Sequence, residues 1–395
     1  MKPFQGCYYL GAHRAFSGVK SAFLVVHSVS GCAWGALALR QMGRQDDVRQ
    51  GCTMVHENEV VFGGEAKLAE ALEILKAHGP ERAFVLNGCP TDMVRDDIQA
   101  VIDAADCPFP IAWMNTAGYC GSMRRGFMDA MCFLAGQMPR PESRDEEPSV
   151  NLVGLAPDDY LGEADAEAIR RMLEPEVRLN AVLPMLDEAG MRRFGRARLN
   201  LVFRGFEPVG EALKRALDMD YLVVDYPYGA AGSEAFLREV DAALDCDHRR
   251  IIAEGSECAA KYARQMVHPL RLIYQAEMAV AGDFMRADAM RRFLRDELGV
   301  RVSAYLDDLD PGADAEQWLE DARDSGCVLA FGSTFQRQIE DEAPVRLLRF
   351  AYPVMDAVAL GYRPYAGYDG LPNLLSDIFS GVMGVSYKRH GRFNP

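Results

Sequence analysis

Along this chain, short apolar runs alternate with longer stretches whose apolar residues recur at helical spacing or whose composition favours a helix. The apolar runs predict β-strands over residues 22–26, 83–87, 111–114, 150–155, 199–203, 221–224, 270–274, 300–305 and 327–331. The stretches between them predict α-helices over residues 11–18, 33–44, 65–77, 92–104, 124–135, 163–173, 209–217, 233–244, 283–298 and 314–324. Strands that alternate with helices are typical of parallel sheets in α/β proteins.

These elements fall into three groups, and an irregular segment separates the first group from the second. Residues 139–149 are charged, rich in proline and without periodicity, which predicts a linker. We therefore expect an N-terminal α/β domain over 1–138, a second α/β domain over 150–262, and a third over 263–395 that ends in a C-terminal tail. The predicted fold class is α/β, with three Rossmann-like domains built on parallel sheets.

The overall charge and hydropathy exclude several classes of partner. The formal net charge is −15, and nucleic-acid binding needs clustered Lys and Arg to neutralise phosphates, so we expect no nucleic-acid partner. The sequence contains no apolar run long enough to cross a membrane and no signal peptide. We therefore expect a cytoplasmic protein without a membrane partner.

Three of the ten cysteines stand in similar local sequences. Cys7 and Cys32 lie in glycine-flanked turns 25 positions apart, and Cys32 and Cys89 each follow an apolar run. Loops at the carboxyl ends of parallel strands meet at one edge of a sheet, so the three thiols are candidates to converge. No C-x-x-C occurs, which excludes zinc ribbons and thioredoxin-type redox pairs. Spacing alone leaves two interpretations open: small buried residues, or single ligands to iron from separate loops.

A set of motifs along the chain resembles the nitrogenase component 1 superfamily in order and in spacing. The motifs are Cys7-Tyr8-Tyr9-Leu10-Gly11-Ala12, His27-x-x-x-Gly31-Cys32, Val61-Phe62-Gly63-Gly64, Gly88-Cys89-Pro90 with Asp96-Asp97, Thr116-Ala117-Gly118-Tyr119-x-Gly121-Ser122, Asp225-x-Pro227-Tyr228-Gly229, Glu297-Leu298-Gly299, Gly332-Ser333, Tyr352-Pro353-x-x-Asp356 and Gly367-Tyr368-x-Gly370. The resemblance covers nearly the whole chain, and it implies the three-domain fold of that superfamily.

The resemblance implies a metal site on this chain. Cys7, Cys32 and Cys89 match the cysteines that hold half of an iron–sulfur cluster (4Fe-4S or 8Fe-7S type), and a homologous α-like subunit donates the other half. The 25-residue spacing of Cys7 and Cys32 and the late Gly-Tyr-x-Gly look like a β-type subunit. The cluster serine of that type falls on Gly118, and Cys120 is either its replacement or a buried thiol.

The function implied by the resemblance is that of a β-like subunit in an α2β2 two-component reductase. Its cluster would relay electrons from a homodimeric, ATP-dependent iron–sulfur reductase to a small-molecule substrate site mainly on the α-like partner. No G-x-x-x-x-G-K-[ST] occurs, so ATP is expected only on the separate reductase. His27-Ser28 and Arg95 depart from the family pattern, which argues against dinitrogen reduction and favours a methylthio-alkane reductase. The alternatives are a tetrapyrrole reductase or reductive cyclase subunit, a non-catalytic scaffold for metal-cofactor assembly, and a degenerate subunit without a cluster.

Other residues near these motifs have two interpretations each, and we assign no catalytic residue to this chain. His27 is either a hydrogen-bond donor near the cluster or a packing histidine that caps a turn. Asp96 and Asp97 are catalytic carboxylates or, more simply, acids at a helix N-terminus. Two tyrosines and a tryptophan beside the ligand loops either shield the cluster from water or pack at an interface: Tyr8, Tyr9 and Trp34.

Overall fold

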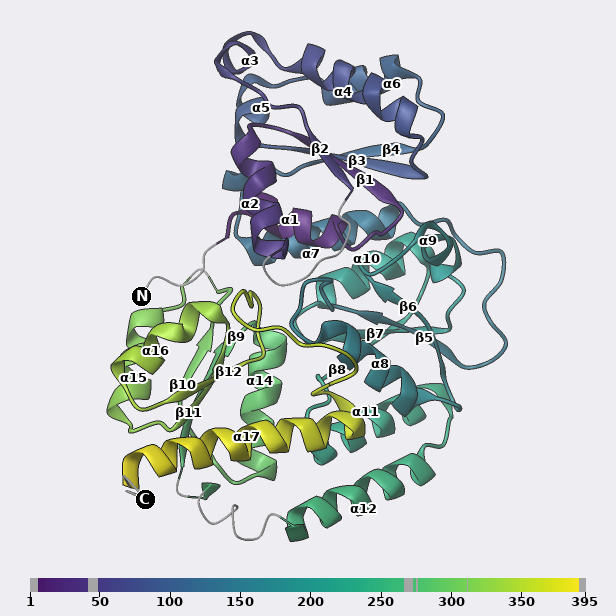
Figure 1. Cartoon of the computed structure of the whole chain (residues 1–395). Helices are drawn as coiled ribbons and strands as arrows, with labels where there is room; N and C mark the ends of the chain where they lie inside the picture. Colours follow the sequence, from purple (N-terminus) through teal and green to yellow (C-terminus); the bar gives the residue numbers. More distant parts are fainter. Residues whose placement is uncertain (1–5, 42–48, 266–272, 275, 311, 391–395) are drawn as a thin grey trace.

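The protein is built on three parallel four-stranded sheets, which confirms the predicted α/β fold class (Figure 1). The computed structural model describes residues 6–41, 49–265, 273–274, 276–310 and 312–390. The first sheet has the order β2-β1-β3-β4, with β1 Ala22–His27, β2 Gln50–Cys52, β3 Arg82–Asn87 and β4 Ile111–Asn115. The second has the order β6-β5-β7-β8, with β5 Ser149–Val153, β6 Arg178–Leu183, β7 Leu199–Phe203 and β8 Tyr221–Val224. The third has the order β10-β9-β11-β12, with β9 Glu277–Gly282, β10 Arg301–Asp307, β11 Leu329–Gly332 and β12 Arg346–Arg349.

Helices cover both faces of the N-terminal sheet. They are α1 Tyr8–Phe16, α2 Ser30–Gln41, α3 Glu57–Phe62, α4 Glu65–His78, α5 Cys89–Val94, α6 Ile98–Ala105, the 3-10 turn η1 Gly118–Cys120 and α7 Met123–Gly136. Leu68, Leu72 and Leu75 of α4 recur at helical spacing and are buried in one cluster with Val25 and Val85 of the sheet. The opposite face packs on α1, where the rings of Phe16 and Phe84 lie 4.7 Å apart.

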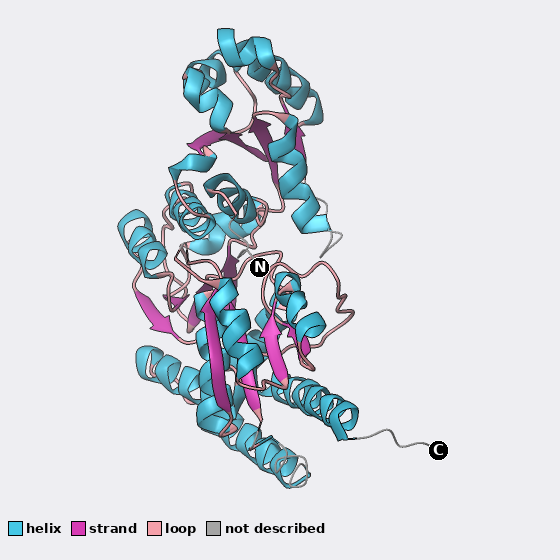
Figure 2. Ribbon diagram, turned by 90° about the vertical axis from the view of Figure 1, so that its left-hand side faces the viewer, coloured by secondary structure: helices cyan, strands magenta, loops and turns pink. Residues whose placement is uncertain are grey.

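The other two sheets carry a second set of helices. They are α8 Gly162–Leu173, α9 Glu188–Phe194, α10 Glu207–Leu217, α11 Gly229–Leu244, α12 Arg249–Gln265, α14 Phe284–Arg292, the π-helix η2 Phe293–Glu297, α15 Ala315–Asp324, η3 Thr334–Arg337, α16 Gln338–Glu342 and α17 Gly367–His390. The view turned by 90° shows the N-terminal sheet at one end of the molecule and the other two sheets below it (Figure 2). Within the described residues, no helix has the length and apolar composition that a membrane crossing needs.

Neighbouring sheets share their hydrophobic cores. One buried cluster joins Leu24 and Leu86 of the first sheet to Leu183 and Val202 of the second. A second cluster joins the second and third sheets with the apolar side of α17. Within the predicted linker 139–149, residues 139–148 have neither helix nor strand, and Ser149 begins β5. Arg144 connects this segment to the second sheet region by donating to Leu217 O at 2.7 Å. The domain boundaries stay a prediction.

The structure corrects several predicted elements. The predicted C-terminal tail is the 24-residue helix α17, in which Pro372 is tolerated near the start. The predicted helix 92–104 is two helices, because Arg95 adopts a left-handed conformation with φ +62° between α5 and α6. The predicted strand 270–274 falls mostly outside the described residues, and its described part, Ile273 and Tyr274, is not a strand.

Some elements carried no sequence signal that we recognised. The strand β9 supplies the position that the predicted strand 270–274 was expected to fill. The predicted helix 283–298 is α14 followed by the π-helix η2. The elements that were not predicted also include β2, β6, β12, α3, α9, α12 and α16.

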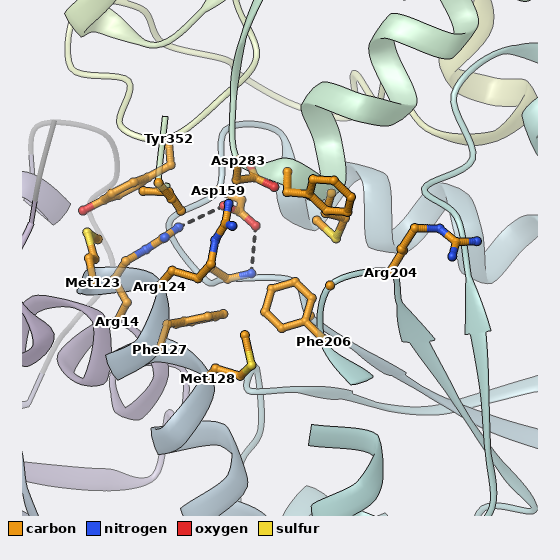
Figure 3. A pocket seen from close by; sticks show the side chains of 16 residues that line it. Arg14, Met123, Arg124, Phe127, Met128, Asp159, Arg204, Phe206, Asp283 and Tyr352 are labelled. Carbon is orange, nitrogen blue, oxygen red and sulfur yellow. Dashed lines mark hydrogen bonds and ion pairs between the residues drawn. The ribbon is translucent and has the colours of Figure 1, made fainter. Parts of the chain in front are cut away.

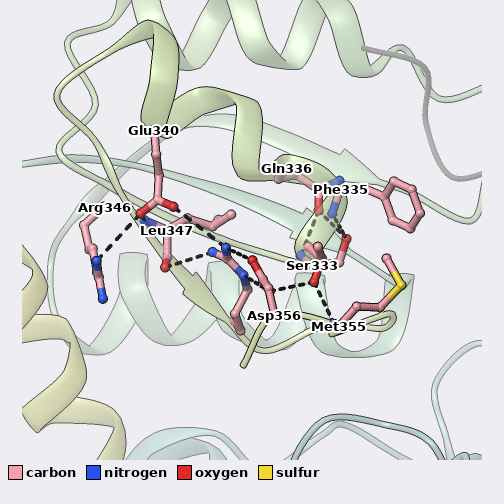
Figure 4. Close-up of polar contacts among 10 residues, drawn as sticks. Ser333, Phe335, Gln336, Glu340, Arg346, Leu347, Met355 and Asp356 are labelled. Carbon is pink, nitrogen blue, oxygen red and sulfur yellow. Dashed lines mark hydrogen bonds and ion pairs between the residues drawn. The ribbon is translucent and has the colours of Figure 1, made fainter. Parts of the chain in front are cut away.

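Two pairs of family motifs far apart in the sequence lie together in the fold. At the end of β11, Ser333 precedes a turn in which Thr334 Oγ1 donates to Asp356 Oδ1 at 2.7 Å, and Arg349 Nε donates to the same oxygen at 2.9 Å (Figure 4). At the start of α11, the backbone N–H of Ala230 donates to Glu297 Oε1 at 2.9 Å. The two motif carboxylates, Asp356 and Glu297, accept these hydrogen bonds and hold loops in place in the second and third sheet regions, away from the cysteine motifs.

Candidate metal centre

The three candidate thiols all lie at the starts of helices. Cys7 precedes α1 as its N-cap, Cys32 lies in the first turn of α2 after β1, and Cys89 is the first residue of α5 after β3. The parallel strands β1 and β3 pair His27 with Asn87 at their carboxyl ends. The loops that carry Cys32 and Cys89 therefore leave the sheet side by side.

Cys7 and Cys89 meet at Gly118. A Cβ atom placed on Gly118 would lie 3.2 Å from Cys89 Sγ and 3.3 Å from Cys7 Sγ. The backbone N–H of Gly118 donates to Cys89 Sγ at 3.1 Å. An isolated antiparallel bridge between Cys7 and Ser122 holds the start of α1 against the η1 loop. Two thiols that are 82 positions apart in the sequence thus lie next to the same glycine, Gly118.

Cys32 is the third thiol of this group. The Ser28 hydroxyl donates to Cys32 Sγ at 3.4 Å. Burial raises the pKa of the Cys32 thiol, and charge on Cys7 and Cys89 raises it further, so the three thiols are electrostatic neighbours. Glycine is required at position 88, because a Cβ there would lie 1.9 Å from Ser28 Oγ.

The donor set at this edge fits an iron–sulfur cluster rather than a single ion. Within the part of the chain that the structure describes, no three His, Cys, Asp or Glu side chains surround one metal ion. A cluster has a different requirement, because each of its irons takes its own thiolate. Cys7 is exposed and Cys32 and Cys89 are half-buried, so the thiols face outward and leave room for ligands from another chain.

Two further thiols lie at the same edge. Cys52 ends β2, donates to Ser28 O at 3.4 Å and accepts from Met54 N at 3.4 Å. Cys120 lies in η1, is exposed, and is close enough to Asp92 and Cys89 for their charges to raise its pKa, after burial as the first cause. No sequence motif singles out Cys52, because the strand that it ends, β2, has no apolar run.

His27, Asp96 and Asp97 make hydrogen bonds that stabilise the N-terminal domain. His27 is fully buried, with Nε2 at 2.9 Å from Asp96 Oδ2 and Nδ1 at 3.1 Å from Thr53 Oγ1. Burial lowers the pKa of His27 in spite of the nearby Asp96 carboxylate. Asp97 caps α6 by accepting from Ala100 N at 3.0 Å. The contacts of all three residues are those of structural residues, so the geometry favours the packing and capping interpretations.

An exposed apolar rim lies next to the thiols on the helices that start at this edge. Trp34 of α2 is 68 % exposed, Phe62 of α3 is 85 % exposed and Met93 of α5 is 73 % exposed. These helices lie along one side of the N-terminal sheet (Figure 1). Tyr8 and Tyr9, by contrast, are buried. Large exposed apolar side chains beside half-buried thiols are typical of a surface that another protein chain covers.

A separate cavity, which no sequence pattern predicted, opens where the three sheets meet (Figure 3). Arg14 of α1 crosses this junction: its Nη2 donates to Asp159 Oδ1 at 2.9 Å, and its guanidinium lies 3.6 Å from the centroid of the Tyr352 ring. Phe127 and Phe206 supply apolar walls. The charged groups of Arg14 and Asp159 are paired with each other. The residues around this cavity therefore serve mainly to connect the three sheets.

Comparisons with known proteins agree with the motifs. The family model described as nitrogenase component 1 type oxidoreductase matches residues 7–383. The nitrogenase molybdenum-iron protein beta chain of Frankia alni is 22% identical, over 97% of this chain and 82% of its own length. The cofactor biosynthesis protein NifE of Methanosarcina barkeri is 24% identical, over 82% of this chain and 74% of its own length.

Two further comparisons extend this result. A light-independent protochlorophyllide reductase subunit of Pinus koraiensis is 20% identical, over 98% of this chain and 84% of its own length. The solved structure of nitrogenase Cp1 at pH 6.5 has the same fold, with a TM-score of 0.84 and 17% identity over 100% of this chain and 95% of that chain. The match to a beta chain fits the β-type features of the cysteine motifs. The chain belongs to the nitrogenase component 1 type oxidoreductase family.

Proposed function

We propose that this chain is the β-like subunit of a nitrogenase-like two-component reductase and holds half of an iron–sulfur centre at its interface with an α-like partner. Cys7, Cys32 and Cys89 are the proposed ligands. The observation that carries the proposal is the approach of Cys7 and Cys89 to Gly118 at an outward-facing sheet edge, with Cys32 beside them. Ligands from separate loops on an open edge suit a cluster shared between two chains.

The residues of this chain bind and orient the centre. The thiolates bind iron, the Ser28 hydroxyl and the Gly118 N–H donate to sulfur, and the missing side chain of Gly118 gives the sulfurs space. When bound, an iron–sulfur cluster accepts and releases electrons. The exposed Phe62 and Trp34 offer the partner an apolar surface around the thiols.

The proposed assembly is an α2β2 heterotetramer that works with a separate homodimeric iron–sulfur reductase. ATP binding is assigned to that reductase, because this chain lacks a phosphate-binding G-x-x-x-x-G-K-[ST] loop. The substrate site is assigned mainly to the α-like partner. Small sulfides are the favoured substrates, as in a methylthio-alkane reductase, because the three thiols are present while Gly118 and Arg95 replace residues of the nitrogenase pattern.

Two other functions have specific support. The match to a protochlorophyllide reductase favours a tetrapyrrole reductase or reductive cyclase, which would bind a pigment at the subunit interface. The match to NifE favours a scaffold on which a metal cofactor is assembled. Pigment absorbance of the purified complex tests the first function, and turnover with reductase and ATP separates an enzyme from a scaffold.

Anaerobic co-expression with the homologous partner tests the proposal. Iron and acid-labile sulfide should co-purify with the wild-type complex, and Cys32→Ala should lose most of both. Cys246→Ala is the matched control, because Cys246 lies beyond α11 in the second sheet region and should leave the iron content unchanged. A wild-type complex without iron, or an unchanged iron content in Cys32→Ala, would overturn the proposed ligand set.

A further inference from the structure

The hydroxyl of Ser28 lies between two of the loops that carry the candidate thiols. Ser28 follows β1 directly and is fully buried, so its hydroxyl is shielded from water. The hydroxyl donates to Cys32 Sγ at 3.4 Å. A buried hydroxyl needs a hydrogen-bond partner, and here the partner is the sulfur of a proposed ligand.

Backbone hydrogen bonds on both sides hold Ser28 in this position. Ser28 O accepts from Val55 N at 3.0 Å and from the Cys52 thiol at 3.4 Å, which connects it to the segment that follows β2. The preceding carbonyl oxygen, His27 O, accepts from Gly88 N at 3.0 Å, which connects it to the loop that follows β3. These bonds fix the backbone from which the hydroxyl projects, so its place is determined by two neighbouring strands.

Gly88 leaves the space that the Ser28 hydroxyl occupies. A Cβ atom on Gly88 would lie 1.9 Å from Ser28 Oγ and 2.5 Å from Ser28 Cβ. Gly88 directly precedes Cys89, so Ser28 packs against the Cys89 loop while its hydroxyl donates to Cys32. Ser28 therefore helps to set the spacing of two ligand loops. His27-Ser28 is also a place where this chain departs from the family pattern, so the resemblance does not imply this donor.

We propose that Ser28 is a positioning residue whose hydroxyl holds Cys32 Sγ in place and raises the reduction potential of the iron–sulfur centre. This inference rests on the proposed function, since it requires a cluster on Cys32. A hydrogen bond to a cluster sulfur directs the positive end of the O–H dipole at the centre and stabilises its more negative, reduced state. Burial of Ser28 strengthens this effect, because water does not compete for the hydroxyl.

A redox titration of the iron-loaded complex, followed by electron paramagnetic resonance, compares Ser28→Ala with the wild type. Ser28→Ala should keep the iron content and shift the midpoint potential to a more negative value. Ser233→Ala is the matched control, because Ser233 is also fully buried but donates to Gly229 O at 2.6 Å in the second sheet region. It removes a buried serine hydroxyl that does not contact sulfur, so its midpoint potential should equal that of the wild type.

A second variant, Ser28→Gly, removes the same hydroxyl and should give the same negative shift, so the result does not depend on one substitution. A midpoint potential equal to or above that of the wild type in either iron-loaded variant would overturn the role of Ser28 alone. Loss of iron from both variants, or an equal shift in Ser233→Ala, would also overturn it, while the iron of the wild-type complex would still support the proposed function. A wild-type complex without iron would overturn the proposed function together with this inference.

Discussion

Gly118 donates its backbone N–H to Cys89 Sγ at 3.1 Å, and the absence of a side chain on Gly118 lets Cys7 approach the same point. A methyl group at this position would lie 3.2–3.3 Å from both sulfurs, which is closer than ordinary van der Waals contact. The two cysteines would have to move apart to admit it. The geometry of the centre therefore depends on a residue that offers no ligand of its own.

Gly118→Ala should lower the iron content of the anaerobically purified complex modestly, by about twofold or less, because the new methyl group requires both sulfurs to shift by only a few tenths of an ångström. Gly136→Ala is the matched control: among the described residues, no atom outside its own turn of α7 lies within 4 Å of the added Cβ, so iron content should not change. Iron and sulfide analysis of the two variants measures the effect. Equal iron in Gly118→Ala and the wild type would show that the sulfurs have more freedom than their contact with Gly118 implies.

The buried His27 should make the stability of the metal-free chain depend on pH. Burial lowers its pKa in the folded state, so the unfolded chain binds the proton first as the pH falls. The stability that a neutral His27 contributes is complete above the unfolded pKa of about 6.5 and is lost as the pH falls from there toward the folded pKa. The slope contributed by this group is at most about 1.4 kcal/mol per pH unit.

Urea unfolding between pH 7.5 and 5.5 measures this slope, and His27→Gln provides the comparison. The variant lacks the titrating group, so its free energy of unfolding should change less over this interval than that of the wild type. Parallel curves would mean that the pKa of His27 is the same in the folded and the unfolded chain, with the Asp96 carboxylate at 2.9 Å offsetting the effect of burial.

Arg95 adopts a backbone conformation that the local sequence does not predict. Its left-handed φ of +62° ends α5, yet neither glycine nor proline marks the position. Arg95→Gly should raise the free energy of unfolding by about 0.5–1 kcal/mol, because relief of the left-handed strain exceeds the entropy cost of glycine. Arg95→Ala keeps a Cβ and should bring no gain. Denaturant midpoints compare the variants, and a lower midpoint for Arg95→Gly would contradict the argument.

The parts of the fold that sequence alone predicted are those fixed by local pattern. β1 and β3 contain the uninterrupted apolar runs 22–26 and 83–86, and Leu68, Leu72 and Leu75 mark α4 by their spacing, so these elements were confirmed. The three-residue strand β2, Gln50–Cys52, has no apolar run and pairs only because β1 lies beside it. The position of Cys52 at the thiol edge could not be predicted for the same reason.

The sequence alone did not predict the contacts between segments that are far apart in the chain. His27 and Asp96 are 69 positions apart, and only the fold places them 2.9 Å from each other. The cysteine motifs indicated which thiols could bind metal, but the contact of Gly118 with two sulfurs depends on how α1 and η1 pack. Patterns identified the residue types, and tertiary packing determined their partners.

Arg14 should be one of the most sensitive positions for stability. It is buried at the junction of the three sheets, bonded to Asp158 at 2.7 Å and Asp159 at 2.9 Å, and it stacks on Tyr352. Arg14→Met leaves two buried carboxylates without their cation, which should cost about 3–5 kcal/mol. Arg250→Met removes an exposed pair with Glu254 and should cost less than about 1 kcal/mol. Denaturant unfolding ranks the two variants, and a small loss in Arg14→Met would show that the carboxylates are protonated or hydrated.

The exposed rim beside the thiols should carry much of the affinity for the partner. Phe62 of α3 is 85 % exposed, and removing an exposed phenylalanine side chain from water at an interface contributes about 2 kcal/mol. Phe62→Ala should therefore weaken association with the α-like subunit about 30-fold, measured by sedimentation at graded concentrations. Ile74→Ala is the control, since Ile74 is also exposed, at 56 %, but lies on α4 over the outer face of the sheet. Equal weakening by both variants, or by neither, would place the partner on another surface and would separate the thiol edge from the subunit interface.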